Sequence, residues 1–371
     1  MTDRDSARKL SGPKVSHTFD PHRFGFEVIG RGREFSSRII ERITATMPEL
    51  TERSIRNLQV VITGATNGIG KEIARGVATR GARIVLLARD RPKAEGVATE
   101  LTALGAAAVE IVEVDLAQLD SVRAAVIELH SRLSHIDVLV NNAGVTLFSS
   151  GRPTVDGFEP QIAINHLAPF LLTLSTLDLL RAAPSPARII VTASEGHRHA
   201  SLPDPATLAE PVRYGLLRGQ LVYGQSKLLN ILFTKVLARR LAGTGTTVNC
   251  FCPGVVSTGL VRGNSLVSWL WGLGERAHLL RRPEQGARMG LRLILDPGLE
   301  GVSGEFFTST PGLRLLPPVR AMTEYELQRQ IWHRSAELVG VDAETIGGES
   351  MIATVGSGHA PRSASTGMDG E

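Results

Sequence analysis

Short apolar runs alternate with longer amphipathic stretches along the middle of the chain, from residue 59 to residue 252. The apolar runs show little polar alternation, which is typical of strands buried on both faces of a parallel sheet. We predict strands at 59–63, 83–88, 108–114, 137–140, 187–192 and 246–252. We predict helices up to about residue 80 and at 92–104, 119–133, about 156–180 and about 221–242. This alternation indicates an α/β fold with helices on both faces of a parallel sheet.

One domain, over residues 57–340, accounts for all of these elements, and no internal repeat is visible. Residues 1–56 form an N-terminal extension, in which the stretch 34–47 predicts a helix that ends at Pro48. Its helical spacing is carried by Phe35, Ile39, Ile40 and Ile43. Two roles stay open for this helix: docking on the main body, or contact with a membrane or a partner through a basic amphipathic face. Residues 341–371 are expected to be a disordered tail, since they are mostly small and polar.

Charge and hydropathy exclude several function classes. The net charge is +4, and no block of five like charges occurs, so we do not expect nucleic-acid binding. The first residues lack the apolar core of a secretory signal. The longest apolar run is far below the ~20 residues that a membrane span needs. We therefore expect a cytoplasmic protein, and contact with a membrane surface stays open.

The cysteines and two nearby histidines offer candidate metal ligands. Cys250 and Cys252 would point to the same face of a strand, and no further ligands lie close to them in the sequence. Buried, reduced thiols are the expected state, as in a reducing cytosol. His197 and His199 alternate in a polar segment, where surface positions are more common than metal ligation. We therefore expect no metal.

A glycine-rich turn, TGATNGIG at 63–70, follows the first strand and opens a helix. Gly64 permits a tight turn, Gly68 lets the backbone approach a pyrophosphate, and Gly70 lets helix and strand pack closely. The free N–H groups at the helix N-terminus then attract phosphate. This pattern is a dinucleotide-binding signal because it lies between a strand and a helix. It favours a Rossmann-type, doubly wound sheet.

The end of the second strand bears on the choice of dinucleotide. An NAD site would be expected to place an acidic residue there to bind the ribose 2′-hydroxyl, but the strand ends in Ala88-Arg89. Arg89 can pair with the 2′-phosphate of NADP(H), which we predict as the cofactor. In the alternative, Arg89 stacks on the adenine and Asp90 reaches the ribose.

Tyr223 and Lys227 are four residues apart on a predicted helix and therefore share one face. A tyrosine hydroxyl near pKa ~10 exchanges protons poorly at neutral pH, and a nearby ammonium group lowers that pKa. Ser194 follows the strand at 187–192, at the sheet edge where α/β proteins bind ligands. Tyr223, with Lys227 beside it, is therefore a candidate for proton transfer, and Ser194 is a candidate for ligand binding.

Taken together, these motifs resemble the short-chain dehydrogenase/reductase family over residues 57–340. The matching pieces are TGATNGIG at 63–70, VDLA at 114–117, NNAG at 141–144, Asn165, Ser194, YGQSK at 223–227 and PGVVST at 253–258. Within the family the chain looks most like the retinol dehydrogenase and WW-domain oxidoreductase group, although it has no WW domain. That closer likeness lies in NHLAPFLLT at 165–173, SEGHRH at 194–199, SKLLNILFTKVLARRL at 226–241, PEQGA at 283–287 and IWHRSAELVG at 331–340. One departure is Ala193, where the family often has a second serine.

The resemblance implies a role for each matching residue. Tyr223 would be the general acid in reduction and the base in oxidation, with Lys227 lowering its pKa and holding the nicotinamide ribose. Ser194 would bind the substrate oxygen, and Asn165 would bend its helix and hold a relay water. Cofactor contacts would come from Thr63, Gly64, Thr66, Asn67, Gly68, Ile69, Gly70, Arg89, Asp115, Leu116, Asn142, Ala143, Gly144, Tyr223, Lys227, Pro253, Gly254, Val256 and Thr258.

The segment after PGVVST is expected to close over the substrate. It holds Leu266, Val267, Trp269, Leu270, Trp271 and Leu273, and no charged residue lies between 265 and 274. The resemblance therefore implies a small lipophilic carbonyl or alcohol substrate, such as a retinoid, a steroid or a long-chain aldehyde. In the alternative, this segment is a core contact or a contact with a second subunit of a homo-oligomer. A dinucleotide sensor without turnover and a membrane-associated scaffold are two other functions that the sequence leaves open.

Overall fold

The computed structural model describes residues 54–149, 152–254, 261–262, 281–310 and 312–344. A seven-stranded sheet lies at its centre in the order β3-β2-β1-β4-β6-β7-β9, and every neighbouring pair is parallel. The strands are β1 (Gln59–Thr63), β2 (Arg83–Ala88), β3 (Ala108–Glu113), β4 (Val138–Asn141), β6 (Arg188–Thr192), β7 (Thr247–Cys252) and β9 (Phe306–Thr308). The order reverses between β1 and β4, as in a doubly wound sheet. The predicted Rossmann-type fold is confirmed.

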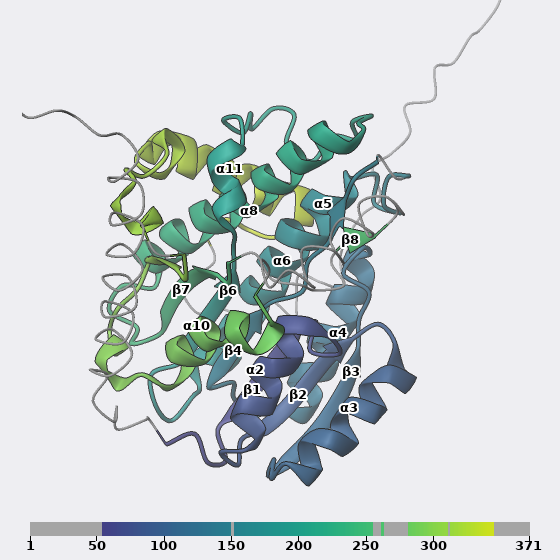
Figure 1. The fold of residues 1–371 in the computed structure, drawn as a ribbon, viewed down its shortest axis with the longest axis vertical. Helices are drawn as coiled ribbons and strands as arrows, with labels where there is room; N and C mark the ends of the chain where they lie inside the picture. Colours follow the sequence, from purple (N-terminus) through teal and green to yellow (C-terminus); the bar gives the residue numbers. More distant parts are fainter. Residues whose placement is uncertain (1–53, 150–151, 255–260, 263–280, 311, 345–371) are drawn as a thin grey trace, which may run out of the picture. The chain divides into compact units, whose positions relative to one another are not determined.

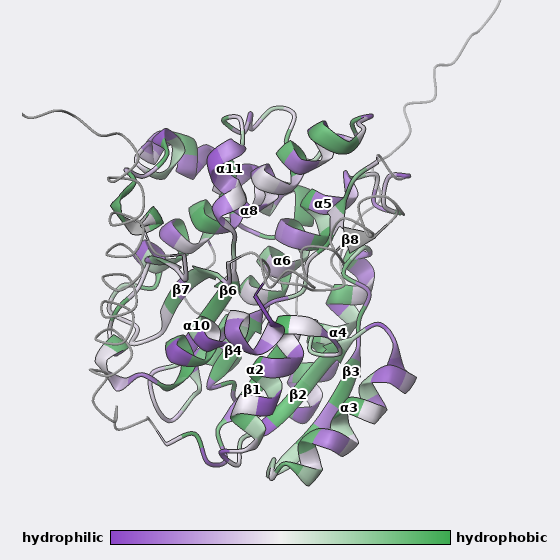
Figure 2. Ribbon diagram, viewed as in Figure 1, coloured by the Kyte–Doolittle hydropathy of each residue, from purple (hydrophilic) through white to green (hydrophobic). Residues whose placement is uncertain are grey.

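Helices cover both faces of this sheet, and their apolar sides form two separate cores (Figure 1). One face carries α2 (Gly68–Ala78), α3 (Arg91–Ala103) and α10 (Pro283–Leu295). The other carries α4 (Leu119–Arg132), α6 (Ala168–Leu174), α7 (Leu177–Arg181), α8 (Leu216–Arg240) and α11 (Tyr325–Val339). The central strands are hydrophobic along most of their length (Figure 2), which is why their sequence lacks polar alternation.

The helix predicted at 156–180 is instead broken into pieces. It begins with α5 (Pro160–Ile162), continues through a π-helical turn (Ala163–Leu167) into α6, and resumes as α7. Thr173 and Thr176 donate their hydroxyls to main-chain carbonyls four residues back, which bends helices. The prediction of one continuous helix was therefore wrong. The sequence did not reveal the breaks because the spacing of apolar residues continues across them.

Other differences are smaller. α8 begins at Leu216, five residues before its predicted start. A two-stranded parallel pair, β5 (Thr146–Leu147) with β8 (Val261–Arg262), lies outside the main sheet, and neither it nor β9 was predicted. These strands have two or three residues each, too few for a periodic pattern. The predicted N-terminal helix at 34–47 and the tail from residue 345 lie outside the described residues.

Candidate active site

The glycine-rich turn packs directly against the chain that leaves β4. Gly64 has a φ of +68°, and a Cβ on it would lie 2.8 Å from Ala143 Cα. A Cβ on Gly70 would lie 2.3 Å from Asn142 Nδ2. The Thr63 hydroxyl accepts the N–H groups of Asn142 and Ala143, both at 3.0 Å. The turn therefore needs glycine at two positions, and Thr63 holds both loops in one fixed arrangement.

The first turn of α2 offers unpaired N–H groups beside this cradle. Asn67 has an extended backbone and its side chain makes no capping hydrogen bond, so it leaves these groups to a ligand. The Ile69 side chain is buried in the core. Thr66 is partly exposed. These features fit a bound pyrophosphate.

The residues predicted at the adenine end meet at the ends of β2 and β3. Arg89 is 63% exposed, and its Nη1 lies 4.0 Å from Asp115 Oδ1. Asp115 Oδ1 also accepts the N–H of Ala117 at 3.0 Å, and Leu116 packs on the core. Asp90 accepts the N–H of Lys93 at 3.0 Å and so caps α3. Its carboxylate is thus committed to the helix, which weakens the alternative in which Asp90 binds the ribose.

Tyr223 lies on α8 at the carboxyl edge of the sheet, where the helix meets β5 and the turn after Ser194. A Cβ on Gly196, in the turn after Ser194, would lie 3.4 Å from Ser194 Oγ and 3.6 Å from Tyr223 Cε1. Burial raises the pKa of Tyr223 to about 12, although hydrogen bonds with the hydroxyls of Ser194 and Thr146 lower it. The phenol therefore faces two other hydroxyls and stays protonated at neutral pH.

Two glycines on α8 allow this convergence. A Cβ on Gly224 would lie 2.5 Å from the Gly196 carbonyl oxygen, and a Cβ on Gly219 would lie 2.4 Å from the Leu147 carbonyl oxygen. Because neither glycine has a side chain, the backbone carrying Ser194 and the strand β5 carrying Thr146 both approach the helix closely. Tyr223 lies between these two contact points in the sequence.

Lys227 is buried one turn along α8 from Tyr223. Its Nζ donates to the Thr192 carbonyl oxygen at 2.9 Å and lies 5.7 Å from the centre of the Tyr223 ring. Burial lowers the pKa of Lys227 to about 8. The largest influence on the pKa of Tyr223 is burial, which raises it, and the lowering by Lys227 stays a prediction.

Asn165 lies in the π-helical turn and holds the chain that follows NNAG. Its Nδ2 donates to the Val145 carbonyl oxygen and to Ser226 Oγ, both at 2.9 Å, and its Oδ1 accepts the Val145 N–H at 2.8 Å. Both side-chain N–H groups are therefore engaged within the protein. Asn165 lies in the π-helical turn, and its roles in bending the helix and holding a relay water stay predictions.

Of the remaining residues predicted to contact the cofactor or the substrate, some are described by the structure and some are not. Asn142, Ala143 and Gly144 line the gap between the glycine turn and Lys227, since a Cβ on Gly144 would lie 3.3 Å from Lys227 Nζ. Pro253 and Gly254 follow β7, and Gly254 has a φ of +85°. Val256, Thr258 and the apolar segment 266–273 lie outside the described residues.

Sequence comparison agrees with this geometry. A sequence model of the short chain dehydrogenase family matches residues 59–202. Human retinol dehydrogenase 11 is 38% identical over 289 residues, covering 76% of this chain and 86% of that protein. Mouse retinol dehydrogenase 14 is 38% identical over 303 residues, covering 76% and 86%. The chain belongs to the short-chain dehydrogenase/reductase family.

Solved structures of this family have the same fold. The Pseudomonas aeruginosa RhlG–NADP complex matches with a TM-score of 0.56 and 25% identity, over 71% of this chain and 98% of RhlG. L-Sorbose reductase from Gluconobacter frateurii, solved with NADPH and L-sorbose, matches with a TM-score of 0.56 and 25% identity, over 71% of this chain and 99% of that protein. This short-chain dehydrogenase/reductase is thus an oxidoreductase acting on CH–OH or C=O groups.

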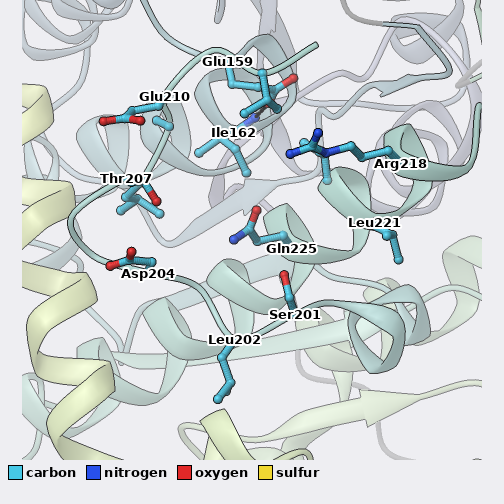
Figure 3. Close-up of a pocket in the computed structure, with 14 residues that line it drawn as sticks. Glu159, Ile162, Ser201, Leu202, Asp204, Thr207, Glu210, Arg218, Leu221 and Gln225 are labelled. Atoms are coloured by element: carbon cyan, nitrogen blue, oxygen red, sulfur yellow. Dashed lines mark hydrogen bonds between the residues drawn. The ribbon is translucent and has the colours of Figure 1, made fainter. Parts of the chain in front are cut away.

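A cavity of about 300 Å³ lies beside α8 in this dehydrogenase (Figure 3). It is bounded by Glu159 and by the chain from Ser201 to Val212. On α8 its lining residues are Arg218, Leu221, Val222 and Gln225. At 100° per residue these four positions point away from the face of Tyr223 and Lys227. The cavity is therefore separate from the candidate active site.

The sequence predicted exposed histidines at 197 and 199 and buried cysteines at 250 and 252, and one of these predictions was wrong. His197 was expected at the surface but is buried: its Nδ1 lies 2.7 Å from the Ser194 carbonyl oxygen, and its ring packs edge-on against Phe306. The expectation failed because Phe306 belongs to β9, which was not predicted. His199 is exposed. Cys250 and Cys252 are buried and free, as expected.

Thr146 and Cys252 were not assigned to the site from the sequence. Thr146 faces Tyr223, and Cys252 contacts the segment after Ser194. Both lie next to recognised motifs, since Thr146 is two residues beyond NNAG and Cys252 directly precedes PGVVST. The only sequence signal for assigning them to the site was their position beside a motif. That position does not show which way a side chain points.

Replacing Gly64 with alanine should weaken both the fold and dinucleotide binding. The positive φ and the contact with Ala143 should cost about 1–3 kcal/mol of unfolding free energy. Urea unfolding and a fluorescence titration with NADPH would measure the two effects. Gly96→Ala is the matched control: Gly96 lies on α3 with no atom within 4 Å of its ideal Cβ, so that variant should be as stable as wild type or more so. If the two variants had the same stability and the same affinity for NADPH, the proposed role of Gly64 in the dinucleotide-binding turn would be wrong.

Proposed function

We propose that this chain is an NADP(H)-dependent oxidoreductase that interconverts a carbonyl and an alcohol on a small lipophilic substrate. The observation that carries this proposal is the grouping of Tyr223, Ser194 and Lys227 beside a glycine cradle for a dinucleotide. A sensor without turnover has no need of a phenol held between two hydroxyls, which makes catalysis the better explanation.

The proposed chemistry assigns one task to each side chain. The bound dinucleotide supplies or accepts the hydride. Ser194 and Tyr223 bind the substrate oxygen, and Tyr223 donates its proton to that oxygen in reduction and removes it in oxidation. Lys227, held by the Thr192 carbonyl, presents its ammonium group toward the ribose. Asn165 fixes the chain after Gly144 and so keeps the cofactor side of the site in place.

NADP(H) is favoured over NAD(H) by the residues that follow β2. Arg89 is exposed at the strand end and lies 4.0 Å from Asp115, which leaves its guanidinium able to pair with a 2′-phosphate. Asp90 is engaged as the cap of α3. The basic residues Arg91 and Lys93 stand in the first turn of the same helix, and their charge also favours a phosphate there.

The substrate class rests on the retinol dehydrogenase relatives and on the apolar segment 266–273. No helix of the described residues is both long and apolar enough to cross a membrane. A role of the N-terminal helix at a membrane surface and assembly into a homo-oligomer stay predictions. Turnover of a panel of aldehydes from short to long, with NADPH and NADH in parallel, tests the proposal. Absence of turnover with every aldehyde would favour the sensor.

Arg89→Asp should reverse the cofactor preference. Loss of the guanidinium and gain of a carboxylate should raise KM for NADPH by about tenfold to a hundredfold and improve the relative use of NADH. Steady-state kinetics with both cofactors would measure the change. Arg329→Asp, on α11, makes the same change of charge and should leave the preference intact. A wild-type enzyme that prefers NADH would show that the NADP assignment is wrong.

A further inference from the structure

Cys252 ends β7 at the point where the chain leaves the sheet toward Pro253 and Gly254. Its side chain is only 2% exposed. Its Sγ accepts two main-chain hydrogen bonds, from the N–H of Glu195 at 3.2 Å and from the N–H of Gly254 at 3.4 Å. Glu195 directly follows Ser194. One sulfur atom therefore joins the two loops that leave the neighbouring strands β6 and β7.

This sulfur lies beyond the last main-chain bond between the two strands. The register pairs Thr192 with Phe251, and the final bond runs from the Ala193 N–H to the Phe251 carbonyl oxygen at 2.8 Å. From there the chains separate, one toward the catalytic serine and the other toward the loop expected at the nicotinamide. Among the described residues, the hydrogen bonds at Cys252 are what tie these two loops together past that point.

We propose that Cys252 is a positioning residue, whose sulfur sets the distance between Ser194 and the nicotinamide end of the cofactor. The inference rests on the roles proposed above for Ser194 and for Pro253-Gly254. Removing the acceptor leaves two partly buried N–H groups without their partner, so both loops will shift to find other acceptors. A displacement of about 1 Å at reacting groups can cost about a hundredfold in rate.

Cys250 provides a matched control on the same strand. It is also buried and points to the same face, but its thiol donates to the Glu305 carbonyl oxygen at 3.6 Å, away from Ser194. Truncating either cysteine to alanine removes the same atom from the core. Only the change at Cys252 removes an acceptor from the two loops.

The test compares Cys252→Ala, Cys252→Val and Cys252→Ser with Cys250→Ala, using NADPH and decanal. Valine removes the acceptor while filling the space and suiting a strand, so it carries the test if the alanine variant is too unstable to purify. The measurements are kcat per dinucleotide-binding site, KM for NADPH and the primary isotope effect with NADPH deuterated at the transferred position. The isotope effect reports on hydride transfer itself, which a loss of folded protein does not change.

We expect Cys252→Ala and Cys252→Val to lower kcat by about tenfold to a hundredfold, with a larger isotope effect and little change in KM for NADPH. Cys252→Ser, whose oxygen also accepts hydrogen bonds, should recover part of the rate. Equal kcat and isotope effects for the Cys252 and Cys250 variants, or no recovery with serine, would overturn the inference. Ser194→Ala in the same assay separates the two proposals: if that variant keeps full kcat, the proposed function itself fails.

Discussion

Tyr223→Phe should reduce kcat for carbonyl reduction by about 10²–10⁴-fold, the usual cost of losing a general acid. The ring and its packing are kept, and only the hydroxyl between Ser194 and Thr146 is lost. The glycine cradle is untouched, so NADPH should bind with nearly normal affinity. Stopped-flow or steady-state turnover of one verified aldehyde, together with a fluorescence titration of NADPH, would measure both quantities.

The raised pKa of Tyr223, about 12, also predicts how the rates respond to pH. Reduction needs the protonated phenol, which dominates at every pH well below 12, so its rate should be nearly flat from neutral to mildly basic pH. Oxidation of the alcohol needs the phenolate, whose fraction grows about tenfold per pH unit below the pKa. The oxidation rate should therefore rise with pH over the same range.

Two variants of the site complete this prediction. The phenylalanine variant should lose the pH dependence of oxidation along with the rate. Thr146→Val removes a neighbouring hydroxyl but leaves the acid in place, so it should cost much less than Tyr223→Phe. If Tyr223→Phe keeps a kcat close to wild type on a verified substrate, the assignment of the general acid is wrong.

The sequence was sufficient for features that depend on short stretches of chain. The glycine turn, the alternation of strands and helices and the spacing of Tyr223 and Lys227 are all local, and the fold they predict is confirmed. Arg89 could be placed because the end of a buried strand fixes the position of the residue that follows it. In each case the neighbours in the sequence are also the neighbours that determine the geometry.

The sequence was insufficient where distant segments meet. Burial of His197 depends on β9, more than 100 residues later, and the sulfur of Cys252 meets the chain after Ser194 only in the folded sheet. The Asn165 side chain in the π-helical turn bonds to Val145 and Ser226, which are 20 and 61 residues away in the sequence. The raised pKa of Tyr223 was also not visible in the sequence, because helical spacing shows that a lysine is near but not how the fold surrounds the phenol.

Lys227→Met should nearly abolish turnover and yet make the cofactor-free protein more stable at neutral pH. Methionine has a similar length but cannot donate to the ribose, and loss of one positioned donor typically costs about 10²–10³ in rate. Dinucleotide affinity should fall as well, which distinguishes this variant from Tyr223→Phe. The Thr192 carbonyl keeps a donor in the variant, since Asn230 Nδ2 lies 3.4 Å from it.

The gain in stability follows from the lowered pKa of Lys227, about 8 against 10.5 for the free side chain. Below pH 8 the folded protein holds a buried charge that the unfolded chain carries in water, and this costs up to about 3 kcal/mol. Between pH 8 and 10.5 the folded state releases the proton while the unfolded state keeps it, so the wild-type protein becomes relatively more stable as pH rises. The advantage of Lys227→Met should therefore be largest at pH 7 and shrink by pH 10.

Urea unfolding of the two proteins at pH 7 and pH 10, without cofactor, measures this difference. Lys235→Met is the control, because Lys235 is on the same helix but only partly buried, and its variant should show no such trend with pH. A Lys227→Met protein that is less stable than wild type at pH 7 would contradict the burial of a charged ammonium group. The expected combination, higher stability with lost turnover, would show that this lysine is kept for catalysis at the expense of the fold.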